Sequence, residues 1–304
     1  MQHITFPNGP VTMAGNLFTP EGFDESTSYP ALVVVHPGGG VKEQTAGLYA
    51  EKLAALGYVT LAFDASFQGE SGGEPHFLED PAARVHDVSA AIDHLQSLEF
   101  VGAERIGVWG ICAGGGYGAT ATMVDKRIKA FGAASALNIG TSWRQGWDGS
   151  GAVSDANEAL DGVGQQRTAE KAQGADVAES QYVPVEVTDD VPRDMAEAHD
   201  YYLTPRAQHK NAENRYLLTE SIPRIMAYDA FHLAEEMFTA PLLLVAGAEA
   251  GSLWHSTQLH GMVRSEKKLV VVEGAAHMDF YDVPEYVDRA VAEAEPFFAK
   301  HLAA

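Results

Sequence analysis

One stretch, Arg105-Ile-Gly-Val-Trp-Gly-Ile-Cys-Ala-Gly-Gly-Gly-Tyr117, indicates how this chain folds. The apolar run Ile106 to Ile111 predicts a strand, and Tyr117 to Val124 is compatible with a helix. Between them, Gly110-x-Cys112-x-Gly114 matches the G-x-S-x-G nucleophile elbow with sulfur in place of oxygen. So tight a turn places its central residue at strained backbone angles. Only glycine-sized residues two positions before and after it avoid a clash with the adjacent strand and helix. We therefore expect Cys112 to be a nucleophile, although a free cysteine is usually just a small buried hydrophobe.

Length and composition restrict the class of protein. The chain has 304 residues, enough for one large α/β domain with an insertion, and one cysteine, which excludes an internal disulfide. Its start has neither the basic end nor the apolar core of a signal peptide, and no apolar run reaches membrane-spanning length. A net charge of −22 disfavours nucleic acid and anionic membrane surfaces as partners. We expect a cytoplasmic protein, and a homodimer is left open.

Strand and helix patterns alternate along most of the chain, which predicts a mostly parallel sheet with right-handed crossovers. The expected strands are 4–8, 11–18, 31–37, 58–64, 106–111, 128–136, 240–247 and 268–274. The expected helices are 44–56, 81–98, 117–124 and 284–302.

The alternation breaks after the sixth strand. Residues 141–239 lack strand-like runs but carry helical patterns and many aromatic residues, and this is too long for a plain loop. We interpret them as a helical lid inserted into an α/β core formed by residues 1–140 and 240–304.

The whole chain resembles the α/β-hydrolase superfamily. The resemblance rests on His36-Pro-Gly-Gly-Gly40, the loop Phe63 to Gly72, the elbow, and Gly274-Ala-Ala-His277 after the last strand. Nucleophile first and histidine last is the chain order of that fold. An elbow with cysteine as its central residue resembles that of dienelactone hydrolases. The segments around it are similar to those of fungal polyketide transferases and thiohydrolases. The resemblance implies acyl transfer or hydrolysis through cysteine.

The resemblance also assigns the site. Cys112 would attack an acyl carbon, and His277 would act as general base and then acid. The N-terminus of the following helix would favour the Cys112 thiolate, and His277, if adjacent, would favour it further. The oxyanion hole would be formed by the N–H of Ala113 with that of Gly38 or Gly39. Many superfamily members place the triad acid three residues after a glycine that ends the penultimate strand. Ala250 occupies that position here, so Glu249 is the nearest carboxylate and the expected acid, with Asp279 as a substitute.

The expected function is cysteine-dependent hydrolysis or acyl transfer on a carboxylic ester, lactone or thioester, with a small-molecule acyl substrate. No metal site is expected, because no histidine and carboxylate pair has zinc-site spacing, and no cofactor is implied, because phosphate-loop and dinucleotide fingerprints are missing. Two alternatives remain open. One is a non-catalytic ligand-binding homologue, and the other is carbon–carbon bond chemistry, such as cyclisation or retro-Claisen cleavage, in the same pocket.

Overall fold

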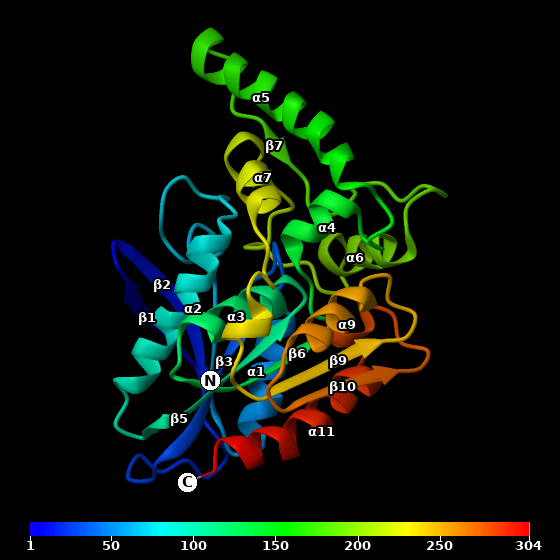
Figure 1. The fold of residues 1–304 in the computed structure, drawn as a ribbon. Helices are drawn as coiled ribbons and strands as arrows, with labels where there is room; N and C mark the ends of the chain where they lie inside the picture. The colour runs from blue at the N-terminus through cyan, green and yellow to red at the C-terminus, as the bar shows by residue number, and fades with distance from the viewer. Residues whose placement is uncertain (304) are drawn as a thin grey trace.

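The computed structural model describes residues 1–303, and these contain one eight-stranded sheet in the order β1-β2-β4-β3-β5-β6-β9-β10 (Figure 1). Strands β3, β4, β5, β6, β9 and β10 run parallel, whereas β2 pairs antiparallel with both β1 and β4. The predicted α/β-hydrolase fold is confirmed. The strands are β1 (Gln2–Asn8), β2 (Val11–Phe18), β3 (Tyr29–Val35), β4 (Val59–Phe63), β5 (Val101–Ile111), β6 (Ile128–Ala134), β9 (Leu242–Gly247) and β10 (Lys267–Val272).

Helices cover both faces of the sheet (Figure 1). Along β3, Leu32 and Val34 belong to one apolar core, whereas Val33 and Val35 belong to the other. This alternation is typical of a strand buried on both sides, and it accounts for the continuous apolar run in its sequence. The helices of the core are α1 (Thr45–Ala55), α2 (Pro81–Gln96), α3 (Ala113–Val124), α9 (Leu253–Met262), α10 (Asp279–Asp282) and α11 (Pro284–His301).

Residues 141–239, which we call the insertion, join β6 to β9, and most of their helices lie in the upper part of the molecule in Figure 1. The segment is mainly helical, as expected, but it also contains a two-stranded antiparallel sheet that the sequence did not suggest. Helix α5 extends away from the rest of the fold (Figure 1). The elements of the insertion begin with α4 (Ile139–Gln145), which starts two residues before it. They continue with a 3₁₀ turn (Val153–Asp155), α5 (Ala156–Gln173), β7 (Glu179–Ser180), α6 (Arg193–Leu203), β8 (Tyr216–Leu217), α7 (Leu218–Ala227) and α8 (Ala234–Met237).

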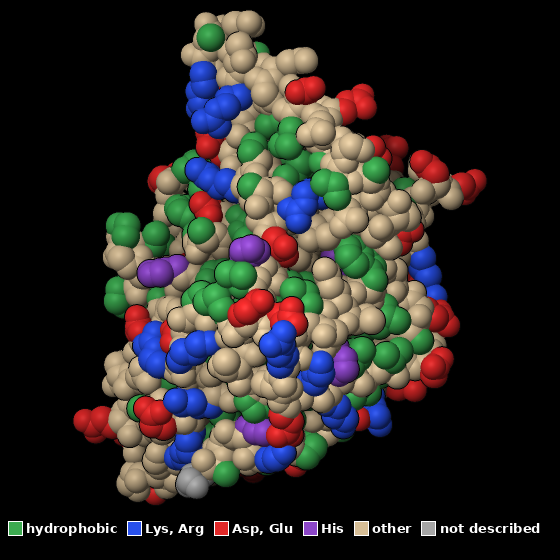
Figure 2. Space-filling model, viewed as in Figure 1, with side chains coloured by type: hydrophobic (Ala, Val, Ile, Leu, Met, Phe, Trp, Pro, Cys, Tyr) green, Lys and Arg blue, Asp and Glu red, His purple; other side chains and the backbone are tan. Residues whose placement is uncertain are grey.

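The surface carries charges of both signs. Figure 2 shows one face, on which Lys and Arg side chains are scattered among acidic ones and do not gather into a single basic patch. Within residues 1–303, none of the helices has both the length and the apolar character needed to cross a lipid bilayer.

The elbow is formed by a close approach of backbones. Helix α3 begins at Ala113, four residues before the expected start at Tyr117, so the glycine run belongs to the helix itself. A Cβ atom on Gly114 would lie 2.2 Å from the carbonyl oxygen of Val35, and one on Gly110 would lie 2.5 Å from that of Gly114. The predicted requirement for glycine on both sides of Cys112 is therefore confirmed.

We expect Gly114→Ala to lower the free energy of unfolding by about 3 kcal/mol, because the added methyl group forces α3 away from β3. Gly162→Ala is the matched control. Gly162 also lies in a helix, α5, but a Cβ there meets nothing within 4 Å, so this variant should gain about 0.5–1 kcal/mol from helix propensity. Urea unfolding of both variants measures the difference, and equal stabilities would contradict the steric account of the elbow.

Candidate active site

Cys112 lies at the turn from β5 into α3 with φ of 53°, a left-handed value that L-residues other than glycine seldom adopt. Hydrogen bonds on both sides hold this turn: the Cys112 N–H donates to Ala134, and the Cys112 carbonyl accepts from Gly115 and Leu137. The side chain is only 7% exposed and faces a cavity. The fold thus fixes the sulfur in an orientation that β5 alone would not produce.

Two backbone N–H groups, of Ala113 and Gly38, face the sulfur of Cys112. Gly38 follows β3, and a Cβ on it would come within 3.6 Å of the Ala113 side chain, so the two expected oxyanion donors are brought together. The other candidate, Gly39, has φ of 71° and lies under the ring of Tyr182, whose hydroxyl donates to the Gly39 carbonyl at 2.9 Å.

A buried ion pair anchors the loop that carries Gly38. The Nζ atom of Lys42 donates to the Asp64 carboxylate at 2.7 Å, and the Lys42 N–H donates to the same carboxylate at 2.8 Å. Both side chains are almost fully buried, and Asp64 directly follows β4. This contact ties the loop after β3 to the end of the neighbouring strand, which keeps the Gly38 N–H aimed at the elbow.

The environment favours the neutral thiol over the thiolate. Burial raises the pKa of Cys112 to about 11, against the lowering effects of the Tyr281 hydroxyl and the Ala113 and Gly38 N–H groups. This differs from the sequence-based expectation that the helix N-terminus and His277 would favour a thiolate. The physical reason is desolvation, which penalises the charged form more than these dipoles stabilise it.

His277 is connected to Cys112 through Tyr281. The Tyr281 hydroxyl bonds to the Cys112 sulfur and lies 3.4 Å from Nε2 of His277. On the other side of the ring, Nδ1 of His277 lies 2.5 Å from Oγ of Ser252. The imidazole is fully buried, which lowers its pKa to about 4 and keeps it neutral, the form that can accept a proton.

Glu249, the expected acid, lies elsewhere. Its side chain is about half exposed and pairs with Arg193 at the surface, so the structure does not bring the Glu249 carboxylate to the imidazole. Asp279 instead accepts from the N–H of Ala276 at 2.7 Å. Asp194, on α6 of the insertion, has its buried carboxylate beside His277, with Oδ1 3.4 Å from the His277 backbone N.

The cavity beside Cys112 has a volume of about 390 Å³ and lies between the core and the insertion. Its wall is mostly aromatic and aliphatic, and no Lys, Arg, Asp or Glu side chain contributes to it within the described chain. The lining residues are Gly38, Cys112, Ala113, Leu137, Ile139, Ser142, Trp143, Trp147, Gln181, Tyr182, Val183, Met195, Ala198, Tyr202, Tyr216, Met278 and Tyr281.

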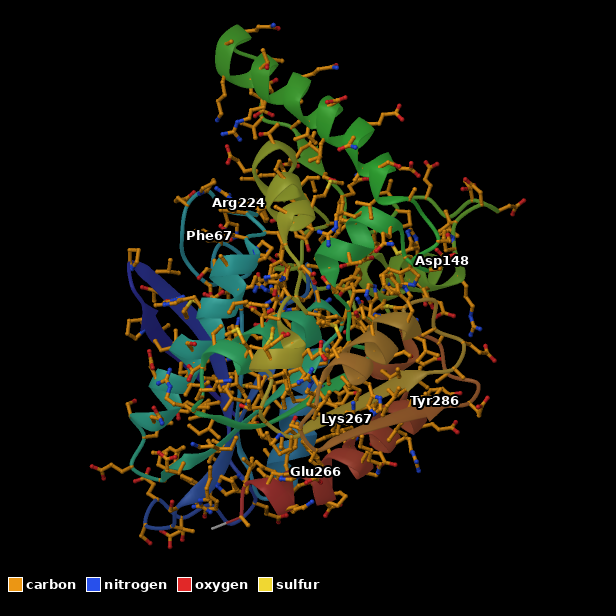
Figure 3. All side chains as sticks on the ribbon, viewed as in Figure 1. Phe67, Asp148, Arg224, Glu266, Lys267 and Tyr286 are labelled. Atoms are coloured by element: carbon orange, nitrogen blue, oxygen red, sulfur yellow. The ribbon has the colours of Figure 1, made fainter. Side chains whose placement is uncertain are left out.

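A second, smaller cavity of about 270 Å³ shares Trp147 in its lining with the first. It is lined by Asp148, which Figure 3 labels in the insertion, and by Asp194, Arg193 and Glu249. The exposure of Arg193 and Glu249 places one side of this cavity at the surface, whereas the buried Asp194 carboxylate forms part of its inner wall.

One group of acidic residues in the described chain has the spacing to hold a cation: Glu43, Asp64 and Glu70. The Lys42 ammonium already lies among them, 2.7 Å from an oxygen of each. This cluster is therefore a site for the chain's own cation.

Three residues near His277 were missed by the sequence analysis. Tyr281 had a usable signal, because it follows His277 by four residues and would share its face in a helical turn. Ser252 lies two residues past Ala250, but serine is common in loops. Asp194 had no distinguishing signal, since the chain has 42 acidic residues and this one lies 83 positions from the histidine.

Comparisons with known proteins identify relatives along the whole chain. The model of the dienelactone hydrolase family matches residues 13–138. The Escherichia coli protein YcjY is 45% identical over 301 residues, which cover 98% of each chain. The crystal structure of hypothetical protein PA2218 from Pseudomonas aeruginosa has a TM-score of 0.91 and 34% identity, covering 99% of this chain and 93% of that one.

A shorter match is more specific about chemistry. A thiohydrolase of Eupenicillium brefeldianum is 30% identical over 107 residues, which cover 35% of each chain.

We expect Cys112 to react with iodoacetamide roughly a hundredfold more slowly at pH 7 than an ordinary thiol, because almost none of it is thiolate. The rate should rise about tenfold per pH unit between pH 7 and 9, since the pKa lies well above this range. Tyr281→Phe should slow the reaction further, because the Tyr281 hydrogen bond lowers the thiol pKa in the wild type and its loss raises that pKa.

Mass spectrometry of the single cysteine measures these rates. Tyr286→Phe is the control, since Tyr286, labelled in Figure 3, lies on α11 outside the cavity wall. A rate that levels off below pH 8 would show a thiolate and contradict the assigned pKa.

Proposed function

The chain belongs to the dienelactone hydrolase family of α/β hydrolases, and from this premise we propose that it cleaves a carboxylic ester, lactone or thioester through an acyl-enzyme on Cys112. The observation that supports this most directly is the surroundings of one sulfur atom. Two backbone N–H groups face it, and a hydroxyl connects it to a buried neutral imidazole. A nucleophile, a base and an oxyanion hole are the three parts that acyl transfer requires.

In the first half-reaction, His277 accepts the thiol proton at Nε2, with the Tyr281 hydroxyl as the bridge between them. The sulfur attacks the acyl carbon, and the carbonyl oxygen becomes an oxyanion held by the N–H groups of Ala113 and Gly38. Collapse of this intermediate breaks the bond to the leaving group, which takes the proton from the imidazolium. Loss of one oxyanion donor costs about 2.7–4 kcal/mol in comparable sites.

In the second half-reaction, water attacks the thioester and gives its proton to His277. The acid product leaves, the proton returns to the sulfur, and the thiol is restored. Proton transfer of this kind contributes about 10²–10⁴-fold to the rate.

The cavity supports a neutral, partly apolar acyl group. Its wall has no charged side chain to pair with a carboxylate or an ammonium, and a buried unpaired charge is costly. Its aromatic residues favour an acyl group with considerable apolar surface. The fungal thiohydrolase relative supports thioesters among the candidate substrates.

Of the alternatives, a non-catalytic binding protein is disfavoured because Cys112, His277 and both oxyanion donors are present together. No specific contact favours carbon–carbon bond chemistry over acyl transfer.

We expect intact-protein mass spectrometry to show an acyl adduct on the wild type after brief mixing with p-nitrophenyl butyrate or an acyl thioester. Cys112→Ala should form no adduct, because it has no nucleophile. His277→Gln should acylate about 10²-fold or more slowly, because it has no base. A wild-type protein that turns substrate over without an adduct, or an adduct that persists in Cys112→Ala, would exclude the Cys112 route.

Ala198 offers a test of the acyl side of the site. It lies on α6 in the cavity wall, so Ala198→Phe should fill part of the volume that receives the acyl group. We expect kcat/KM for a phenylbutyryl ester to fall about 10–100-fold, whereas that for the acetyl ester changes little, since a few methylenes of space are worth about 1–3 kcal/mol. Equal losses on both esters would show that Ala198 does not border the acyl subsite.

A further inference from the structure

The Asp194 carboxylate is buried beside the catalytic pair without a basic partner. Its Oδ2 accepts from the N–H of Gly251 at 2.8 Å and from Nε1 of Trp147, and its Oδ1 lies 3.4 Å from the His277 backbone N. Within residues 1–303, no Lys, Arg or His forms an ion pair with it; the adjacent Arg193 pairs with Glu197 and Glu249 instead. A carboxylate in such a place costs free energy that packing alone does not require.

The groups that face His277 differ in their charge at neutral pH. Cys112 and Tyr281 are protonated, because burial raises the pKa of both, and His255 on α9 is neutral, because burial lowers its pKa to about 3. Asp194 is the member of this set that can bear a negative charge. Burial lowers the pKa of His277, and the Asp194 charge acts in the opposite direction by favouring the imidazolium.

We propose that Asp194 is the positioning carboxylate of His277, and that the insertion, which carries it on α6, therefore completes the catalytic site when it packs on the sheet. This inference rests on the proposed acyl-enzyme function. Asp194 holds the loop after β9 by accepting from the Gly251 N–H. It also holds Trp147, whose ring packs edge-on against the His277 imidazole with 4.8 Å between the ring centroids.

The same helix also covers the acyl cavity. Met195, Ala198 and Tyr202 of α6 line its wall, so a single element contacts the acyl group and holds the charge beside the base. Any displacement of α6 would remove both together. An open insertion would leave His277 without its stabilising charge, so the nucleophile would be activated only after the cavity is closed.

The first test compares three conservative variants in single-turnover acylation across pH 3.5–8. Asp194→Asn keeps the shape but removes the charge, and we expect its plateau rate to fall about a hundredfold. The acidic limb of its pH–rate profile should move to lower pH. His277 acts as a base only when it is unprotonated, and loss of the nearby negative charge lowers the pKa of His277. Asp200→Asn is the matched control, because Asp200 lies on α6 but is exposed and pairs with Arg206; it should behave as wild type. Glu249→Gln tests the competing acid and should leave the acidic limb unchanged.

The second test uses the smaller cavity as an entry path. Asp194→Ala leaves a carboxylate-sized space that adjoins a cavity reaching the surface. Added sodium formate should restore acylation at least tenfold, whereas sodium chloride at equal ionic strength should not. Circular dichroism at each pH confirms that the variants are folded.

These outcomes are separable from those of the proposed function. A wild type that forms no acyl-enzyme rejects the proposed function. If the wild type is normal, two results reject the role of Asp194 alone. One is an unchanged acylation rate in Asp194→Asn. The other is a lowered rate in Asp194→Asn with an unmoved acidic limb, together with no formate rescue of Asp194→Ala. A shifted limb only in Glu249→Gln would assign the role to Glu249.

Discussion

The contact on which the rest of the site depends is the approach of α3 to the end of β3. No side chain larger than hydrogen fits at Gly114, because the Val35 carbonyl oxygen occupies the position of its Cβ. The same approach brings the Ala113 N–H, at the start of α3, next to the Gly38 N–H, which follows β3 after a short turn. A steric requirement between two backbones thus determines where the proposed oxyanion hole lies, before any side chain of the site is considered.

The buried charges around the site differ in their partners. Lys42 and Asp64 pair with each other, and Arg84 lies against Glu79 and the His36 carbonyl, so these charges are compensated within the core, where they hold the loop after β3. Asp194 has only N–H donors. In a low-dielectric interior, this difference decides which charge is available to respond when a neighbour becomes cationic. The compensated pairs hold the loop after β3, whereas the role that we propose for Asp194 is to respond to the charge on His277.

The fold could be predicted from the sequence because its determinants are local. Buried parallel strands are continuous apolar runs, and the elbow places its glycines at fixed spacing around Cys112. The same locality led to Gly38, Ala113 and His277 as site candidates, each of which follows a predicted strand, and the structure places all three near Cys112. Asp194 could not be found in this way, because its role depends on how the insertion packs on the core, which no residue spacing records. The raised pKa of Cys112 could not be predicted for a related reason. Burial is a property of the assembled cavity, whereas the sequence indicates only that Cys112 precedes a helix N-terminus.

The protonated state of Cys112 has a consequence for the survival of the protein under oxidative stress. Peroxides and similar oxidants attack thiolates, and the first product, a sulfenic acid, proceeds irreversibly to sulfinic and sulfonic acids where no second thiol can trap it. This chain has no second cysteine with which to form a protective disulfide. A sulfur that stays a thiol is a poor target for such oxidants, so the desolvation that disfavours its ionisation also protects the nucleophile that we propose.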